Sequence, residues 1–211
     1  MRLRGRGFNI VELMVAMVAG LLLVAAVTSL FATILKANQT TMQVSRLNQE
    51  LQSITDMIAR DIQRAGYDSQ ATTWLGAVSG ASEFKFDADN DLMGEISPGS
   101  RVYRCVRVRY DEDGNGVLDD SETHIYGYSS AAKAVRLVDG SVSLPCDLSA
   151  DTFLVSTDNT IEISDLRFSL LASSVSTGTR TIMLSLAGQY KANSALSLTL
   201  QRDIKLRNDG Y

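Results

Sequence analysis

The sequence predicts an α+β fold in which one long amino-terminal helix packs on an antiparallel β-sheet. Two observations lead to this prediction. No proline occurs before Pro98, so a helical pattern can run without interruption through the first part of the chain. After Tyr67 the pattern changes to short alternating runs separated by Gly, Asn, Asp and Ser, which is typical of strands and turns. A helix followed by a run of strands favours a single α+β domain in a chain of 211 residues.

The first half of the predicted helix is apolar on all sides. Leu13 to Leu35 are 23 residues without a charge, roughly 34 Å of helix, which is enough to cross a hydrocarbon core of about 30 Å. Three arginines within the first six residues should keep the amino end in the cytoplasm, with everything after Leu35 outside it. Glu12 lies at the edge of this span, where an unpaired carboxylate is costly, and is therefore a functional candidate.

The second half of the predicted helix is apolar on one face only. We expect the helix to run from about Phe8 to Ala65, roughly 85 Å, with Gly66 as its C-cap. Asp56 and Arg60 are spaced for an i, i+4 ion pair on the polar face. The apolar stripe that should dock on the sheet consists of Val44, Leu47, Leu51, Ile54, Ile58 and Ile62.

The last predicted strand has the clearest alternation. Its apolar residues share one parity and should face the helix stripe, while Ser197, Thr199, Gln201 and Lys205 face away. Residues 69–82 are the expected loosely ordered connection. The predicted strands are 83–86, 102–110, 123–128, 135–138, 152–155, 161–171, 181–190 and 196–206, and the apolar set of the last one is Leu196, Leu198, Leu200, Ile204 and Leu206.

The amino terminus resembles the class III signal of type IV prepilins. In that signal a basic leader ends in Gly, the mature chain begins with Phe, and a Glu follows four residues later; Gly7, Phe8 and Glu12 match all three features. The resemblance implies cleavage between Gly7 and Phe8 by a prepilin peptidase, and N-methylation of Phe8. It also implies that Glu12 pairs with the amino terminus of a neighbouring subunit during filament assembly.

A second resemblance lies at the end of the helix. Residues 58–67, IARDIQRAGY, are similar to the Arg-Asp-Ile/Leu-Arg-x-Ala-Gly-Tyr signature of PilW-family minor pilins, with Gln63 where an arginine is common. The family implies a type IV pilin fold with a leader at 1–7, a transmembrane and polymerisation helix at 8–35, an amphipathic helix at 36–66 and a β-rich periplasmic head at 67–211. It implies a role in priming pilus assembly or in a tip complex.

This resemblance also implies partners and a location. The partners would be the prepilin peptidase, other minor and major pilins, the inner membrane and, as a further candidate, a tip adhesin. The protein would sit in the inner membrane as a single-pass protein, and at the cell surface once assembled.

Two alternatives remain open: a J-type pseudopilin of type II secretion, and a membrane-anchored calcium-dependent binding or adhesive domain. An ordinary secretory signal fits less well because the apolar run is too long, whereas a plain signal anchor would leave Glu12 unexplained.

Charge and residue content argue against two further classes. The formal net charge is -4, and loss of the three leader arginines gives -4 - 3 = -7 for the mature chain. A basic nucleic-acid interface is therefore not expected. His124 is the only histidine, and scattered serines and aspartates around it form no recognisable catalytic set, so we expect no enzyme.

The two cysteines, Cys105 and Cys146, fall in the part predicted to lie outside the cytoplasm. An oxidising compartment favours a structural disulfide between them, worth about 2 to 4 kcal/mol. Two free thiols are the alternative. The absence of a Cys-x-x-Cys motif gives no support to redox catalysis.

Residues 111–122, DEDGNGVLDDSE, match the calcium-loop pattern D-x-[DN]-x-[DN]-G-x5-E. Gly116 would allow the sharp turn, and strands instead of helices should flank the loop. The alternative is a solvated hairpin tip, since Asp-Gly and Asn-Gly form turns readily. A second acidic run at 87–91 has Leu92 where the glycine should be and is interpreted as a turn. The predicted calcium ligands are Asp111, Asp113, Asn115, the Val117 carbonyl, Asp119 and Glu122.

Overall fold

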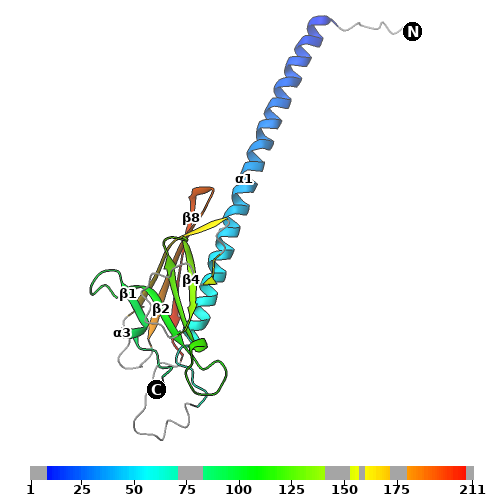
Figure 1. Ribbon diagram of the computed structural model, residues 1–211. Coiled ribbons are helices and arrows are strands. Elements are labelled where there is room, and N and C mark those ends of the chain that lie inside the picture. Colours follow the sequence, from blue (N-terminus) through cyan, green and yellow to red (C-terminus); the bar gives the residue numbers. More distant parts are fainter. Residues whose placement is uncertain (1–8, 71–82, 141–152, 157–159, 172–179, 208–211) are drawn as a thin grey trace. The chain divides into compact units, whose positions relative to one another are not determined.

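The computed structural model describes residues 9–70, 83–140, 153–156, 160–171 and 180–207. Helix α1, Ile10–Arg64, is followed by a sheet whose described part has eight antiparallel strands (Figure 1). The chain divides into two compact units, Met1–Ser45 and Arg46–Tyr211. The second half of α1 therefore belongs to the same unit as the sheet, and the α+β prediction is confirmed.

The sheet order is β5-β4-β3-β2-β6-β7-β8, with β1 paired to β2 beside this path. All pairs are antiparallel, and β6 to β8 form the longest ladders, with ten register pairs between β6 and β7. The strands are β1 Leu92–Glu95, β2 Val102–Arg109, β3 Thr123–Ser129, β4 Ala134–Asp139, β5 Phe153–Leu154, β6 Ile161–Leu171, β7 Thr181–Tyr190 and β8 Asn193–Lys205.

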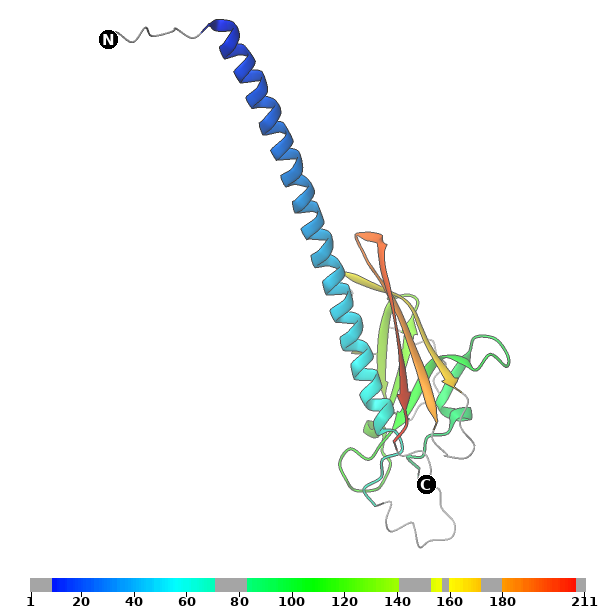
Figure 2. The same cartoon turned by 180° about the vertical axis from the view of Figure 1, so that it is seen from behind.

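The main core lies between the second half of α1 and one face of the sheet. Figure 2 shows β7 and β8 (orange to red) running beside the last turns of α1 (cyan). The predicted stripe is buried from Leu47 to Ile62, but Val44 is exposed, so the stripe begins one turn later than predicted. Gly188 on β7 marks how closely the helix approaches, because a Cβ there would lie 2.9 Å from Leu51 Cδ2.

Most predicted strands are confirmed. β6 and β7 have the predicted limits, and the alternation in β8 is as predicted, with Ile204 and Leu206 in the core and Leu198 and Leu200 packed against it. The helix ends at Arg64, and Gly66 follows with φ +79°, as expected of a C-cap.

Three further predictions were wrong. The strand at 83–86 does not form; Phe84 and Phe86 are buried there outside any strand. The acidic run at 87–91 is not a turn but a one-turn helix, α3 Ala88–Asp91, N-capped by the Asp87 side chain. Asp56 does not pair with Arg60; its carboxylate pairs with Arg202 on β8, while Arg60 Nε donates to the Asp56 carbonyl at 3.1 Å.

Candidate functional site

The acidic loop connects the end of β2 to the start of β3. Asp111 follows Arg109 by two residues, and Glu122 closes a short 3-10 helix, η1 Asp120–Glu122. Gly114 and Gly116 both have positive φ, +80° and +73°. These left-handed residues turn the chain back sharply, so the loop ends converge on one point.

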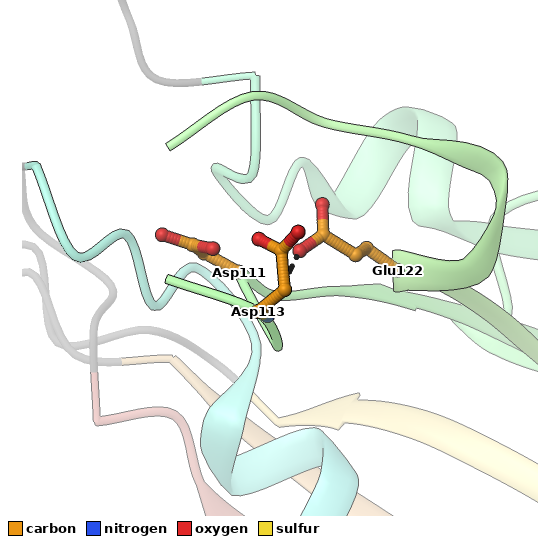
Figure 3. A group of neighbouring side chains, drawn as sticks. All are labelled: Asp111, Asp113 and Glu122. Atoms are coloured by element: carbon orange, nitrogen blue, oxygen red, sulfur yellow. Dashed lines mark hydrogen bonds between the residues drawn. The ribbon is translucent and has the colours of Figure 1, made fainter. Parts of the chain in front are cut away.

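Three of the predicted ligands come together in this loop. One carboxylate oxygen from each of Asp111, Asp113 and Glu122 lies within 4.8 Å of the other two (Figure 3). Asp111 is only 3% exposed and Glu122 only 1%. Gathering carboxylates with so little solvent contact is unfavourable unless hydrogen bonds or a cation compensate.

Backbone N–H groups supply part of that compensation. Asp111 accepts from the N–H groups of Gly114 at 2.7 Å and Gly116 at 3.1 Å. Glu122 Oε1 accepts from Glu112 N at 2.8 Å, and its Oε2 accepts from Asp119 N at 3.2 Å. Hydrogen bonding from Ser69, followed by that from the two glycines, lowers the pKa of Asp111.

The remaining predicted ligands have other roles in the structure. Asn115 Oδ1 accepts from Val117 N at 2.6 Å, and Val117 itself is exposed. The Asp119 carboxylate lies outside the group of three and caps η1, where hydrogen bonding from the Ser121 side chain lowers its pKa. Asn115 and Asp119 thus shape the loop through side-chain to backbone hydrogen bonds, and so does Asp113, whose Oδ1 accepts from Asn115 N at 2.9 Å.

The donor set fits a hard divalent cation. Oxygen ligands at about 2.3–2.6 Å from one ion lie at most about 5 Å from each other, and the three carboxylate oxygens meet that limit. Carboxylate oxygens are the ligands that calcium prefers. Asp111, Asp113 and Glu122 would therefore hold such an ion, which would supply the positive charge that this cluster lacks.

Residues 67–70, shortly after α1, form hydrogen bonds to this loop, which the sequence did not predict. The N–H of Asp111 donates to Tyr67 O at 2.9 Å, and Ser69 N donates to Asp111 Oδ2 at 3.0 Å. Ser69 Oγ reaches Gly114 O at 3.0 Å, and Gln70 Nε2 reaches Asn115 O at 2.7 Å. No sequence signal in residues 67–70 points to these long-range contacts.

The helix-end signature has a structural explanation. Asp61 Oδ2 accepts a hydrogen bond from the hydroxyl of buried Tyr126 on β3. The guanidinium of Arg64 lies 5.7 Å above the ring of Tyr110. The N–H of Gly66 donates to Arg109 O at 2.9 Å. These residues join the end of α1 to β2 and β3.

His124 follows the loop on β3. Its Nδ1 lies 2.8 Å from Asp139 Oδ1, and its ring packs 5.1 Å from the ring of Tyr110. The buried Nε2 has no hydrogen-bond partner in the described part of the chain. The structure thus explains His124 by packing and one polar contact.

The amino-terminal candidates lie in the other compact unit. Glu12 is exposed in the first turn of α1, followed by an apolar run that is exposed throughout. Within the described part of the chain, α1 is the one helix that is both long enough and apolar enough to cross a membrane. Gly7 and Phe8, the predicted cleavage site, lie outside the described residues.

Cys105 is fully buried on β2 in a small second cluster with Ile125, against which Met93 and Val138 pack. Cys146 lies outside the described residues, so the pairing of Cys105 with Cys146 stays a prediction.

Residues 40–206 match the family described as prepilin peptidase-dependent protein B, PpdB. The match covers more than half of the chain. The chain belongs to the PpdB family. It is therefore a prepilin peptidase-dependent, pilin-like protein, and the peptidase is an expected partner. No curated protein and no solved structure shows significant similarity to it.

Proposed function

We propose that this PpdB-family protein is a PilW-like minor pilin of a type IV pilus, acting in assembly priming or in a tip complex. The observation that carries the proposal is Glu12, a carboxylate in the first turn of a helix whose next 23 residues are uncharged. A carboxylate at that position needs a cationic partner when it is buried in an apolar bundle. The amino group of a neighbouring Phe8, freed by cleavage after Gly7, is such a cation.

The proposed life cycle follows from this pairing. The precursor sits in the inner membrane with its amino end in the cytoplasm and its head in the periplasm. The prepilin peptidase removes residues 1–7, Phe8 is methylated, and the helix enters a filament of minor and major pilins that reaches the cell surface. We propose no catalytic activity for the head; its role is to contact other pilins or a tip adhesin.

Two measurements test this proposal. Mass spectrometry of the mature protein should give an amino-terminal methyl-Phe8. Filaments sheared from the cell surface should contain the protein in small amounts relative to a major pilin. A mature terminus at another residue would eliminate the prepilin assignment, and processed protein that never leaves the envelope would favour a J-type pseudopilin or a membrane-anchored binding domain.

We further propose that the acidic loop binds calcium through Asp111, Asp113 and Glu122, with Asn115, the Val117 carbonyl and Asp119 as candidates to complete the shell. The support is the 4.8 Å grouping of three carboxylates, two of them buried. A bound divalent ion would relieve their mutual repulsion and stabilise the folded state, by about 2.7 kcal/mol at an ion concentration 100 times the dissociation constant.

Thermal melting of the full chain in detergent, with millimolar calcium or with a chelator, tests the site. Calcium should raise the melting temperature, and Glu122→Gln should abolish the increase. Asp89→Asn is the matched control, since Asp89 is an exposed carboxylate of the second acidic run. Equal melting temperatures with calcium and chelator would mean that the loop is a hairpin tip only.

A further inference from the structure

The sheet is forked at β2. One side of β2 pairs with β3 over Cys105 to Arg109, whereas its pairing with β6 is limited to Val102 and Tyr103. In the described part of the chain β6 is joined to the other branch at its first residues: the N–H of Ile163 donates to Lys133 O at 2.8 Å, and Lys133 Nζ lies 3.1 Å from Glu162 Oε2. Within the described residues, β6 therefore has no partner strand on this side between Ile163 and Phe168.

A cavity of about 380 Å³ lies at this fork, distinct from the acidic loop. Its volume falls within the range of sites that hold small ligands or peptide side chains. Leu166, buried, and Ile96 give it an apolar part. The complete lining is Ile96, Arg104, Tyr128, Ser130, Asp165, Leu166 and Arg167.

The polar groups of this cavity are mostly donors. In the described part of the chain the Arg104 guanidinium forms no ion pair or hydrogen bond, and the Tyr128 hydroxyl has no hydrogen-bond partner. The single carboxylate of the lining, Asp165, is engaged by Arg167 Nε at 2.5 Å. Two arginines against one aspartate leave the lining with a charge of 2 - 1 = +1.

We propose that this cavity binds an organic carboxylate with a short apolar body. The Arg104 guanidinium would take the carboxylate through two parallel N–H bonds, the geometry in which arginine is most selective for this group. Tyr128 would donate to the same carboxylate, and the apolar body would rest on Leu166 and Ile96. The chain end of a partner protein and a free organic acid both present this chemistry.

Cationic ligands and neutral apolar ligands fit this cavity less well. A cation would face two guanidinium groups, and the one carboxylate available to it is already paired with Arg167. A neutral apolar ligand would cover the partly buried Tyr128 hydroxyl without offering it an acceptor, which is unfavourable, and would gain nothing from the Arg104 charge. A carboxylate satisfies the donors and neutralises the excess charge.

Titration of the full chain in detergent tests the proposal, with the arginine Nε–Hε NMR signals as the readout. The probes are 4-methylpentanoate, as a free acid, and N-acetyl-Ala-Ala-Leu, as a protein chain end; the C-terminal amide of the peptide is the control. We expect a saturable shift of the Arg104 signal with at least one acid, at concentrations up to about 20 mM, and none with the amide. Saturation by the free acid alone assigns the ligand to small acids, and saturation by the peptide alone assigns it to protein chain ends.

Two variants with opposite expected effects on binding distinguish a change in affinity from a loss of folding. Arg104→Gln should weaken binding about tenfold or more, since a charged bidentate contact is removed. Asp165→Asn should strengthen binding, because it frees Arg167 from its internal carboxylate; damage to the fold would not produce a gain. Arg60→Gln, an exposed arginine on α1, is the matched control and should leave binding unchanged. Absence of a saturable Arg104 shift with both acids, or binding to Arg104→Gln at the wild-type level, would overturn the proposal.

Discussion

Replacing Tyr126 by phenylalanine should weaken the attachment of the end of α1 to the sheet. The Tyr126 side chain is fully buried on β3, and its hydroxyl donates to Asp61 Oδ2 on the helix. Asp61 is itself only 16% exposed and its other near charge, Arg64, is 4.0 Å away. The phenylalanine ring would fill the same space but leave the Asp61 carboxylate without its donor.

The magnitude follows from the type of bond lost. A hydrogen bond to a charged acceptor contributes about 1.5–3 kcal/mol, and Asp61 retains some solvent, so we expect a loss of about 2 kcal/mol at pH 8. Burial, followed by the hydrogen bond to Asp61, raises the pKa of Tyr126 far above its usual value near 10.

This raised pKa makes the effect depend on pH in a defined direction. A group whose folded-state pKa is raised contributes stability below its unfolded pKa and loses that contribution as pH rises above it. At pH 11 the unfolded chain gains about 1.4 kcal/mol from ionising this tyrosine. The difference between wild type and Tyr126→Phe should therefore shrink from about 2 to below about 1 kcal/mol between pH 8 and pH 11.

Urea unfolding of a fragment from residue 40 onward, followed by near-ultraviolet circular dichroism, measures this difference. The fragment contains the whole compact unit Arg46–Tyr211. Tyr103→Phe is the control, since Tyr103 is half-buried and its hydroxyl makes no hydrogen bond in the described part of the chain. Equal stability of wild type and Tyr126→Phe at pH 8 would refute the structural role of the bond, and a difference that stays constant to pH 11 would refute the titration.

Three further substitutions test other parts of the structure. Asp91→Asn should cost about 3 kcal/mol in urea unfolding, because this carboxylate is 1% exposed and binds two arginines of β2; a loss below about 1 kcal/mol would contradict this. Gly116→Ala should lower the free energy of unfolding more than Gly99→Ala does, because both glycines have positive φ but only at Gly116 would the new Cβ lie 2.7 Å from a neighbouring side chain. Equal losses of stability would mean that this contact has no effect. Glu12→Ala should leave processing and folding intact while reducing recovery in sheared filaments, and normal recovery would count against the intermolecular pair.

The sequence predicted those elements whose pattern is local. The limits of β6 and β7, the parity of β8 and the end of α1 just before Gly66 all follow from periodicity and from one glycine that adopts positive φ. Such signals depend on neighbours two to four residues apart. They required no knowledge of the partner strand.

The incorrect predictions concern contacts between distant residues. Asp56 has an arginine at i+4, yet its partner is Arg202, 146 residues further along. The acidic run at 87–91 resembles a solvated turn, but Asp91 is buried and forms ion pairs with Arg107 and Arg109 of β2. Local spacing identifies a possible partner, whereas the tertiary fold decides which charge is nearest.

The candidate metal site was predictable in composition and only in part in geometry. The motif brought Asp111, Asp113 and Glu122 together, as its spacing indicated. It did not indicate that Asp119 would cap η1, or that Ser69 would donate to Asp111. The hydrogen bond to Asp119 stabilises the loop itself, and the one from Ser69 attaches the loop to the segment after α1. The donors of both bonds lie outside the positions that the calcium pattern specifies.

Two independent parts of the chain support the assignment to prepilin peptidase-dependent proteins. The resemblance to a prepilin signal rests on residues 1–12, whereas the PpdB family match covers residues 40–206. The two share no residue, so similarity in one cannot have produced similarity in the other. The match also coincides closely with the compact unit Arg46–Tyr211, whose core is formed by the second half of α1 and the sheet. The family relationship therefore concerns the folded head with its helix, and the processing signal adds separate evidence for the same class.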